Sequence, residues 1–170
     1  QGRVFGAEIL VRHRQGERFF GWVAYTLMRA ERRDGPGAPW RPFEFDQTHI
    51  LTAVGSLRLG RGWEVGARFR FVSGVPDALL TGTLYNADTW VYVPFFEPVA
   101  SSRVPAFHQL DLRVDKTFTF RHWTLGLFLD VQNVYNHANV EGVSYNYNFT
   151  KNTYATGIPI LPSIGLRGEF

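Results

Sequence analysis

Few side chains in this sequence have the types and spacing that catalysis or metal binding requires. Asp46 and His49 could suggest an acid–base dyad, but at positions i and i+3 of an expected strand they point to opposite faces. The remaining histidines lack metal-ligand spacing; they are His13, His108, His122 and His137. The chain has no cysteine, which excludes thiolate metal sites and disulfides. We therefore expect no catalytic residues, no bound metal and no cofactor.

The elements that would position any functional side chains are long strands. Residues 107–136, FHQLDLRVDKTFTFRHWTLGLFLDVQNVYN, contain two alternating runs joined by a short polar turn. Because side chains alternate faces on a strand, each run has one apolar and one polar face. Both runs continue for about 9–10 residues, the length of a tilted strand that crosses a bilayer. The alternation fits a soluble sandwich with the leucines inside, and equally a membrane barrel with the leucines against lipid.

Composition limits the class of protein. The chain has 170 residues, enough for one domain, and 16% aromatic residues with 17 Gly and 9 Pro suit long strands separated by turns. No segment approaches the continuous apolar run of a membrane helix, so a membrane role would depend on strands. The net charge of +3 is dispersed, which argues against nucleic acid as a partner. The sequence starts at Gln1 with no charged-then-apolar leader, which would fit either a removed signal or a piece of a longer chain; we expect the second.

The other strands are expected at residues 2–14, 18–31, 46–59, 63–73 and 163–170. On 46–59, Arg58 indicates that the apolar face contains Leu51 and Leu57. On 18–31, Arg29 and Glu31 lie on the Val23 face, so Trp22, Ala24 and Met28 are expected to face outward. Eleven charged residues are expected to share the opposite, polar side, where they would pair with one another or line a substrate path: Glu8, Arg12, Glu64, Arg68, Arg70, Asp111, Arg113, Asp115, Asp130, Arg167 and Glu169.

The connections between these strands alternate in length. Short ones are expected at Gln15–Glu17, Gly60–Gly62 and Thr117–His122, and long ones at Arg32–Phe45, Gly74–Pro105 and His137–Pro162. Consecutive hairpins turn at opposite ends, so all long loops should lie at one end of the sheet. Outer-membrane barrels have this asymmetry, with short periplasmic turns and long extracellular loops. The pattern predicts an all-β, antiparallel transmembrane β-barrel segment of about seven long strands, with a small hairpin in the second long loop.

Three segments of the C-terminal half have a recognisable pattern: RVPAFHQLDLRVDKTF (103–118), LFLDVQNVYN (127–136) and ILPSIGLRGEF (160–170). Three in the first half add to it: GWVAYTLMRAERR (21–33), FDQTHILTAVGSLRL (45–59) and GWEVGARFRFVSGVP (62–76). The most specific parts are Asn133–Asn136 and the terminal Phe170. In these segments nearly the whole chain resembles TonB-dependent outer-membrane receptors.

The resemblance implies a barrel of about 22 strands with a plugged lumen, of which residues 1–170 would be the C-terminal portion. It implies TonB-dependent import of a scarce or bulky ligand across the bacterial outer membrane. The resemblance does not distinguish among a siderophore, a vitamin, a sugar and a peptide as that ligand. The implied partners are outer-membrane lipid, the N-terminal plug and remaining strands of the same protein, TonB through its N-terminal segment, and the barrel-assembly machinery. Ile164, Leu166 and Phe170 share one face of the last strand and would form the C-terminal assembly signal.

Aromatic side chains in the long loops are the candidates for ligand binding: Trp40, Phe43, Tyr85, Trp90 and Tyr92. They could form part of an outer ligand site, pack the loops, or contact lipopolysaccharide. Two other classes of protein also fit the strands. A passive porin-like channel would lack the plug domain, and a secreted β-sandwich binding module would be soluble without detergent and would have short loops at both ends.

Overall fold

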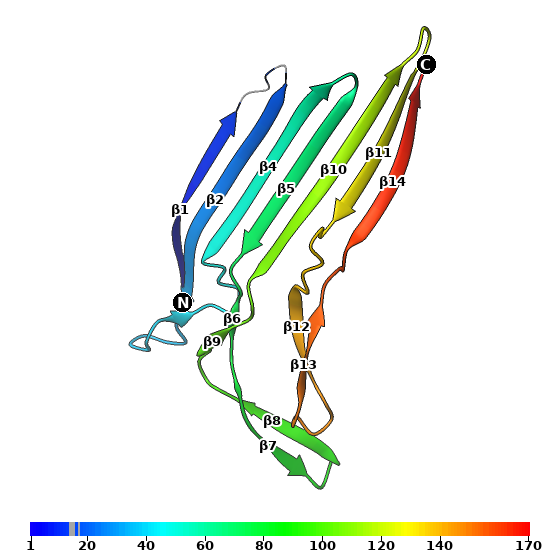
Figure 1. Cartoon of the computed structure of the whole chain (residues 1–170). Helices are drawn as coiled ribbons and strands as arrows, with labels where there is room; N and C mark the ends of the chain where they lie inside the picture. Colours follow the sequence, from blue (N-terminus) through cyan, green and yellow to red (C-terminus); the bar gives the residue numbers. More distant parts are fainter. Residues whose placement is uncertain (14–15, 17) are drawn as a thin grey trace.

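The computed structural model describes residues 1–13, 16 and 18–170, and in this part of the chain every regular element is a strand. Seven long strands form one antiparallel sheet in the order β1-β2-β4-β5-β10-β11-β14 (Figure 1). Their bounds are β1 Gly2–His13, β2 Phe19–Arg32, β4 His49–Gly60, β5 Trp63–Val72, β10 Phe107–Thr119, β11 Thr124–Gln132 and β14 Leu161–Glu169. The prediction of an all-β antiparallel sheet with about seven long strands is confirmed. Among the described residues, no helix is long and apolar enough to cross a membrane.

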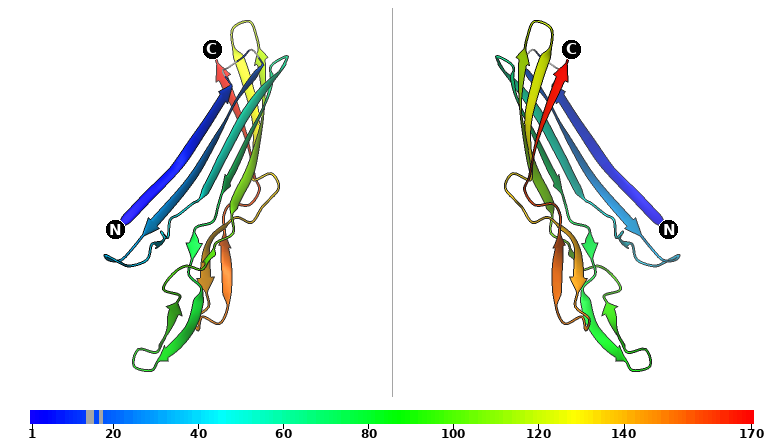
Figure 2. Two further views of the ribbon diagram at one scale, coloured as in Figure 1. Left: turned by 90° about the vertical axis from the view of Figure 1, so that its left-hand side faces the viewer. Right: turned by 90° about the vertical axis from the view of Figure 1, so that its right-hand side faces the viewer.

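The sheet is an open single layer. Its two edge strands are β1 and β14, so no sheet in the described part of the chain closes into a barrel. Seen from either edge in Figure 2, the long strands form one curved layer, and the smaller hairpins extend beyond one end of it.

Short and long connections lie at opposite ends of this sheet, as predicted. The turns at 61–62 and 120–123 lie at one end, which we call the short-turn end, and the chain terminates there at Phe170 (Figure 1). Residues 33–48, 73–106 and 133–160 lie at the other, the long-loop end. Of the turn predicted at Gln15–Glu17, Gln15 and Glu17 lie outside the described residues, as does Arg14 of the first predicted strand.

The long connections contain regular structure of their own. The second contains β6 (Pro76–Asp77) paired with β9 (Ser102–Arg103), and the hairpin of β7 (Leu80–Asn86) and β8 (Val91–Phe96). The small hairpin predicted in this loop is thus confirmed. Two others were not predicted: β3 (Arg41–Pro42) pairs with β2, and β12 (Val140–Tyr145) pairs with β13 (Asn152–Thr156).

Four strand boundaries differ from the prediction by more than a residue. β10 continues to Thr119, inside the turn predicted at 117–122, and β11 ends at Gln132, before the connection predicted from His137. The strand expected from Asp46 begins at His49, because the Asp46 carboxylate accepts a hydrogen bond from Ala30 N (2.6 Å) that holds this segment in the loop. The last strand begins at Leu161 and includes Pro162, which was expected in a loop. Proline is tolerated there because β14 is an edge strand, and a backbone N–H on the open side would have no partner in this sheet.

The register gives the sheet two faces of opposite polarity. Directly paired residues share a face, and one row across six strands is apolar throughout: Phe19, Leu57, Val65, Val114, Leu129 and Ile164. The adjacent row on the other face contains Phe20, Ser56, Gly66, Arg113, Asp130 and Ser163. All eleven charged residues predicted to share one side lie on this second, polar face.

The predicted orientation of the second strand is wrong. Trp22 pairs with Val54, which pairs with Arg68, so Trp22 lies on the polar face together with Ala24 and Met28. Val23 pairs with Ala53 and belongs to the apolar face. Arg29 and Glu31 misled the prediction because they share the apolar face but lie at the extreme long-loop end of the strand.

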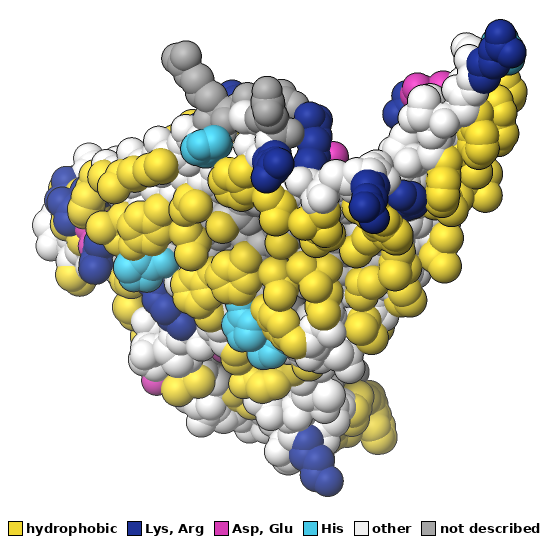
Figure 3. All heavy atoms as spheres, turned by 45° about the horizontal axis from the view of Figure 1, so that its top comes forward, with side chains coloured by type: hydrophobic (Ala, Val, Ile, Leu, Met, Phe, Trp, Pro, Cys, Tyr) yellow, Lys and Arg dark blue, Asp and Glu magenta, His cyan; other side chains and the backbone are white. Residues whose placement is uncertain are grey.

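Almost no hydrophobic core exists within this sheet. Among the described residues only two hydrophobic side chains are buried, Ala30 and Val72. Along the apolar face some large side chains, such as Phe69 and Val114, are half-buried, and the others on the long strands remain exposed, from 36% at Leu112 to 82% at Ile164. In Figure 3 hydrophobic side chains cover most of the face turned to the viewer, and charged side chains line the inner side of the hollow beside it. The apolar face therefore requires a nonaqueous environment or a partner.

The exposed apolar face predicts poor behaviour in water. Residues 1–170 produced alone should aggregate or require detergent, because this face exceeds the apolar patch that soluble monomers tolerate. The measurement is size-exclusion chromatography without detergent, followed by thermal melting. A sharp monomeric peak with cooperative unfolding would contradict this expectation and favour a soluble sandwich.

Candidate functional site

The polar face lines an open hollow at the centre of the sheet. The hollow has a volume of about 490 Å³, and its wall comes from β2, β4, β5, β10 and β11. Charged groups in the wall include Glu64, Arg68, Asp111, Arg113 and Asp130. These residues come together because every one of them occupies a polar-face position in the common register.

Most charges of the hollow are engaged with one another. Arg68 donates two hydrogen bonds to Asp111 Oδ2, from Nε at 2.9 Å and Nη2 at 2.6 Å, and Gln109 donates to the other carboxylate oxygen at 2.7 Å. Arg113 binds Asp115 through two bonds of 2.8 Å. Arg167 pairs with Glu169 at 2.6 Å near the short-turn end. The mutual pairing that the sequence left open is thus present for these residues.

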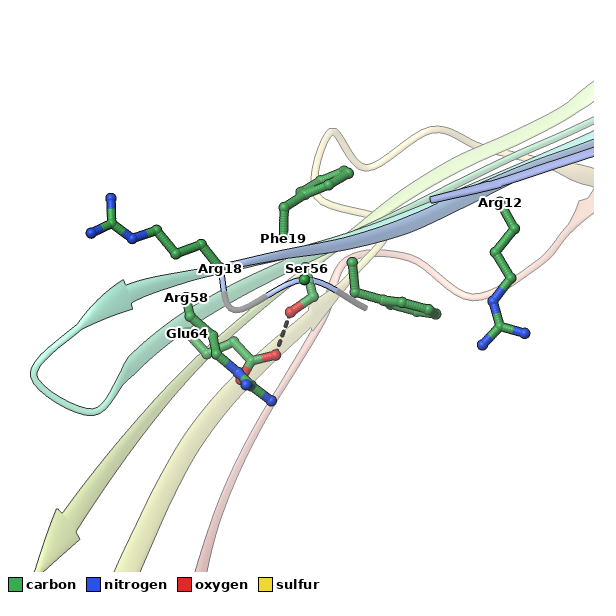
Figure 4. Close-up of a pocket in the computed structure, with 8 residues that line it drawn as sticks. Arg12, Arg18, Phe19, Ser56, Arg58 and Glu64 are labelled. Atoms are coloured by element: carbon green, nitrogen blue, oxygen red, sulfur yellow. Dashed lines mark hydrogen bonds and ion pairs between the residues drawn. The ribbon is translucent and has the colours of Figure 1, made fainter. Parts of the chain in front are cut away.

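A smaller hollow of about 220 Å³ lies near the short-turn end (Figure 4). Ser56 and Glu64 point toward each other and form a hydrogen bond, and Arg58 Nε lies 3.5 Å from Glu64. Arg12 and Arg18 extend to opposite sides of the view. The three arginines therefore do not converge on one point, as an anion site would require.

The apolar face changes character toward its two ends. Its middle rows are aliphatic or Phe, whereas aromatic and cationic groups gather at the short-turn end. There Lys116 Nζ lies 5.0 Å from the rings of both Trp63 and Phe118, and Phe120 stacks on Trp123 at 4.5 Å. Charged side chains on this face are confined to its ends, as far as the described residues show: Arg3, Arg29, Glu31 and Lys116.

At the long-loop end, the same face ends in hydrogen-bonded tyrosine and histidine. Tyr25 Oη and His49 Nδ1 lie 2.8 Å apart, and Tyr135 Oη and His108 Nδ1 lie 2.9 Å apart. The ring of His137 stacks on that of His108 with centroids 3.8 Å apart. This cluster was not predicted, because its histidines are distant in sequence. The alternation of His108 with Leu110 was the signal that could have placed His108 on this face. Among the described residues no group of side chains suits a metal ion.

Asp46 and His49 do not form a dyad. Asp46 is buried in the loop before β4 and is bound by Arg103 Nη2 (2.5 Å), Ala30 N and Thr48 Oγ1 (3.0 Å). Burial raises the pKa of Asp46, but these hydrogen bonds outweigh it and hold the pKa below its ordinary value. A lowered pKa adds stability above the unfolded-state value, and that stability is lost as pH falls through the folded pKa. At neutral pH the ionised Asp46 therefore links the first long connection, residues 33–48, to the second, residues 73–106, through Arg103.

Like Asp46, Asn133 connects segments that are distant in sequence; it is the first residue of the motif Asn133–Asn136. Its side chain is fully buried; Oδ1 accepts from His137 N at 2.9 Å, and Nδ2 donates to the carbonyls of His137 (2.8 Å) and Ile158 (3.1 Å). Its own N–H donates to Asp111 Oδ1 at 3.0 Å. The φ of 51° lies in the left-handed region, which asparagine adopts more readily than most residues. This one residue links the hollow, the turn and the third long connection.

The five loop aromatics predicted as ligand contacts fall into two clusters. Trp40 packs against Arg3 and Arg33, with guanidinium carbons 4.2 and 4.7 Å from its ring centroid, and Phe43 packs against Phe45 at 5.4 Å. Tyr85, Trp90 and Tyr92 belong to the β7–β8 hairpin, where Tyr85 and Tyr92 contact each other at 5.1 Å. Tyr92 also contacts Tyr147 of the β12–β13 hairpin at 5.5 Å, and Tyr147 Oη donates to Trp90 O.

The predicted assembly residues lie together on the apolar face of β14. Leu166 pairs with Leu127 and Ile164 with Leu129, and Phe170 follows in the same alternation with its ring 6.3 Å from that of Trp123. No family model, curated protein or solved structure matched the chain. The geometry itself offers one face suited to apolar surroundings, one suited to water, and tethered loops at a single end.

Replacing Asn133 with Ala should destabilise the protein by about 2–3 kcal/mol, because buried carbonyl and N–H groups lose partners and Ala tolerates the positive φ poorly. Asn133→Gly separates the two causes, since glycine relieves the backbone but restores no hydrogen bond. Asn152→Ala, at an exposed asparagine, is the control. The denaturant midpoint of unfolding would be measured for all three variants. An unchanged midpoint for Asn133→Ala would show that the hydrogen bonds of this side chain do not stabilise the fold.

Proposed function

We propose that this chain forms part of the wall of an outer-membrane β-barrel of the TonB-dependent receptor type, which imports a scarce or bulky ligand. In this proposal the apolar face contacts lipid, the polar face lines the lumen, and the long-loop end is extracellular. The observation that carries the proposal is the apolar face, which no second layer covers and which, in the described part of the chain, is charged only at its two ends.

The dimensions of that face support a membrane setting. On β10 it runs from His108 to Phe118, about 33 Å at about 3.3 Å per residue. At a tilt of about 40° this corresponds to about 25 Å across the membrane, the height of the apolar band of outer-membrane barrels. Tyr and His at one limit and Trp, Phe and Lys at the other suit the two membrane–water interfaces.

The polar face and the loops support the barrel over the sandwich. A sandwich would cover the apolar face with a second sheet, and within the described residues the remaining sheets are two-stranded and belong to the long connections. Loops restricted to one end are typical of outer-membrane barrels. Energised import, as opposed to passive diffusion, is proposed from the sequence resemblance alone, and a plug domain in the same protein would distinguish the two.

The assignment of faces predicts unequal costs for two neighbouring substitutions. In the full-length protein, Leu127→Arg should cost about 2–4 kcal/mol, as expected for arginine against lipid near the midplane. Phe128→Arg should cost clearly less, because position 128 lies on the polar face opposite Asp115. Unfolding from lipid vesicles would compare the two, and equal or reversed costs would mean that the faces are exchanged.

The proposed orientation predicts where an impermeant thiol reagent reaches the protein. Asn86→Cys and Asn152→Cys, in the long-loop hairpins, should be labelled on intact cells. Arg61→Cys, in the turn between β4 and β5, should be labelled only after the outer membrane is permeabilised. The chain has no natural cysteine, so the background is low within it. Equal labelling of Arg61→Cys on intact cells would overturn the orientation.

A further inference from the structure

Two arginines stand on the apolar face at its long-loop end. Arg29 is the next residue on that face after Leu27 of β2, and Arg3 precedes Phe5 on β1. Their side chains are 58% and 47% exposed. Among the described residues of the seven long strands, no other arginine occupies this face. The face that is apolar along its middle therefore ends in a localised positive charge.

A single carboxylate holds both guanidinium groups. Glu31, which pairs with Arg3 across the strands, is only 6% exposed. It accepts from Arg3 Nε at 2.7 Å and from Arg29 Nε at 2.6 Å. One negative charge against two positive charges leaves the group cationic. The Nη atoms of Arg29 form no hydrogen bond with other described residues, so they remain able to bind an anion.

An indole extends the cluster outward. Trp40, from the first long connection, lies between Arg3 and Arg33, whose guanidinium carbons are 4.2 and 4.7 Å from its ring centroid. Arg33 is fixed in turn by Gln1 Oε1, which accepts from its Nε at 2.7 Å. Glu31 occupies the Nε–Nη2 edge of Arg3, and Gln1 occupies that of Arg33. A guanidinium group lying over an indole ring can still use its remaining N–H groups for hydrogen bonding. Trp40 restrains Arg3 and Arg33, and Glu31 restrains Arg3 and Arg29, so three arginines are held close together.

We propose that this cluster, Arg3, Arg29, Arg33 and Trp40, binds the phosphate groups of an anionic lipid in the outer leaflet. Planar guanidinium groups match phosphate oxygens in pairs, and Glu31 pre-orients two of them. The cluster lies in line with the aliphatic rows of the apolar face, so acyl chains lying along those rows bring their headgroups to it. The inference rests on the proposed function, because only a sheet inserted in a membrane meets lipid at this height.

The test uses the full-length protein purified in a neutral detergent and titrated with lipid A, a bisphosphorylated glycolipid, with binding followed by native mass spectrometry. Lipid A lacking its phosphates should bind at least about tenfold more weakly. Arg3→Gln and Arg29→Gln should each weaken lipid A binding about tenfold, since a charge-assisted hydrogen bond contributes on that scale. Arg29→Lys, which keeps the charge but not the paired N–H geometry, should give a smaller loss.

Two controls separate phosphate binding from general effects. Arg70→Gln removes the same charge near the same end, but on the polar face, and should leave lipid A affinity unchanged. Glu31→Gln removes the competing negative charge but keeps both arginines and a side-chain oxygen that can still accept their hydrogen bonds, so it should retain or tighten lipid A binding. Loss of binding in Glu31→Gln equal to that in Arg29→Gln would show that the arginines are structural and would overturn the proposal.

The remaining outcomes distinguish failure of the lipid site from failure of the proposed function. Equal affinity for lipid A in the wild-type protein and in both arginine variants would overturn the lipid site. Displacement of lipid A by millimolar inorganic phosphate would also overturn it, because it would indicate a site for free phosphate. Membrane fractionation of the wild-type protein tests the proposed function separately. If the protein fractionates with the outer membrane while lipid A binding is insensitive to these arginines, only the lipid site fails; absence from that membrane removes both.

Discussion

The structure depends on one constraint: a single layer of long strands must satisfy both of its faces without a second layer. Each residue's face is determined by the register, and a shift of one residue in any pair would move that strand's leucines among the charges. Several rows of paired residues run from β2 to β14, among them those of Phe19 and Phe20, so the polarity of each face is a property of the whole sheet. Because Ala30 and Val72 are the only buried hydrophobic side chains in the described part of the chain, the surroundings of the apolar face must supply most of the stabilisation.

The lack of a core explains why buried polar groups organise the long-loop end. Loops of a globular protein usually pack on a hydrophobic core, whereas here the largest fully buried side chains of residues 1–13, 16 and 18–170 are Asp46 and Asn133. Asp46 joins β2 to the connection that contains Arg103, and Asn133 joins Asp111 to His137 and Ile158. Directional hydrogen bonds replace hydrophobic burial as the means of positioning these segments. The loops at this end are therefore fixed relative to the hollow that they border.

Alternation predicted the strands wherever one face was clearly charged, as on β5 and β10, and it placed all eleven polar-face charges correctly. It failed on β2, where both faces carry large apolar side chains, Phe20 and Trp22 on one and Val23 and Leu27 on the other. The face is determined only by the pairing of Val23 with Ala53 and of Tyr25 with Leu51. It also extended the next strand back to Asp46, because the partner that holds this carboxylate in the loop, Arg103, is distant in sequence. The His108–His137 stack was missed for a related reason: alternation with Leu110 places His108 on the apolar face, but the contact with His137 depends on the turn at Asn133.

Charge on the polar face bears on what the proposed barrel could select. Seven arginines and six carboxylates occupy that face of the long strands. The arginines are Arg12, Arg32, Arg58, Arg68, Arg70, Arg113 and Arg167, and the carboxylates are Glu8, Glu64, Asp111, Asp115, Asp130 and Glu169. A nearly balanced surface produces little net field, so it would neither attract nor repel a ligand strongly by charge. The aromatic hairpin of Tyr85, Trp90 and Tyr92 lies far outside this surface, joined to a second hairpin through Tyr147. In the proposed function, discrimination among ligands in this part of the barrel therefore falls to the hairpins at the long-loop end, and the hollow provides a hydrated, charge-balanced wall.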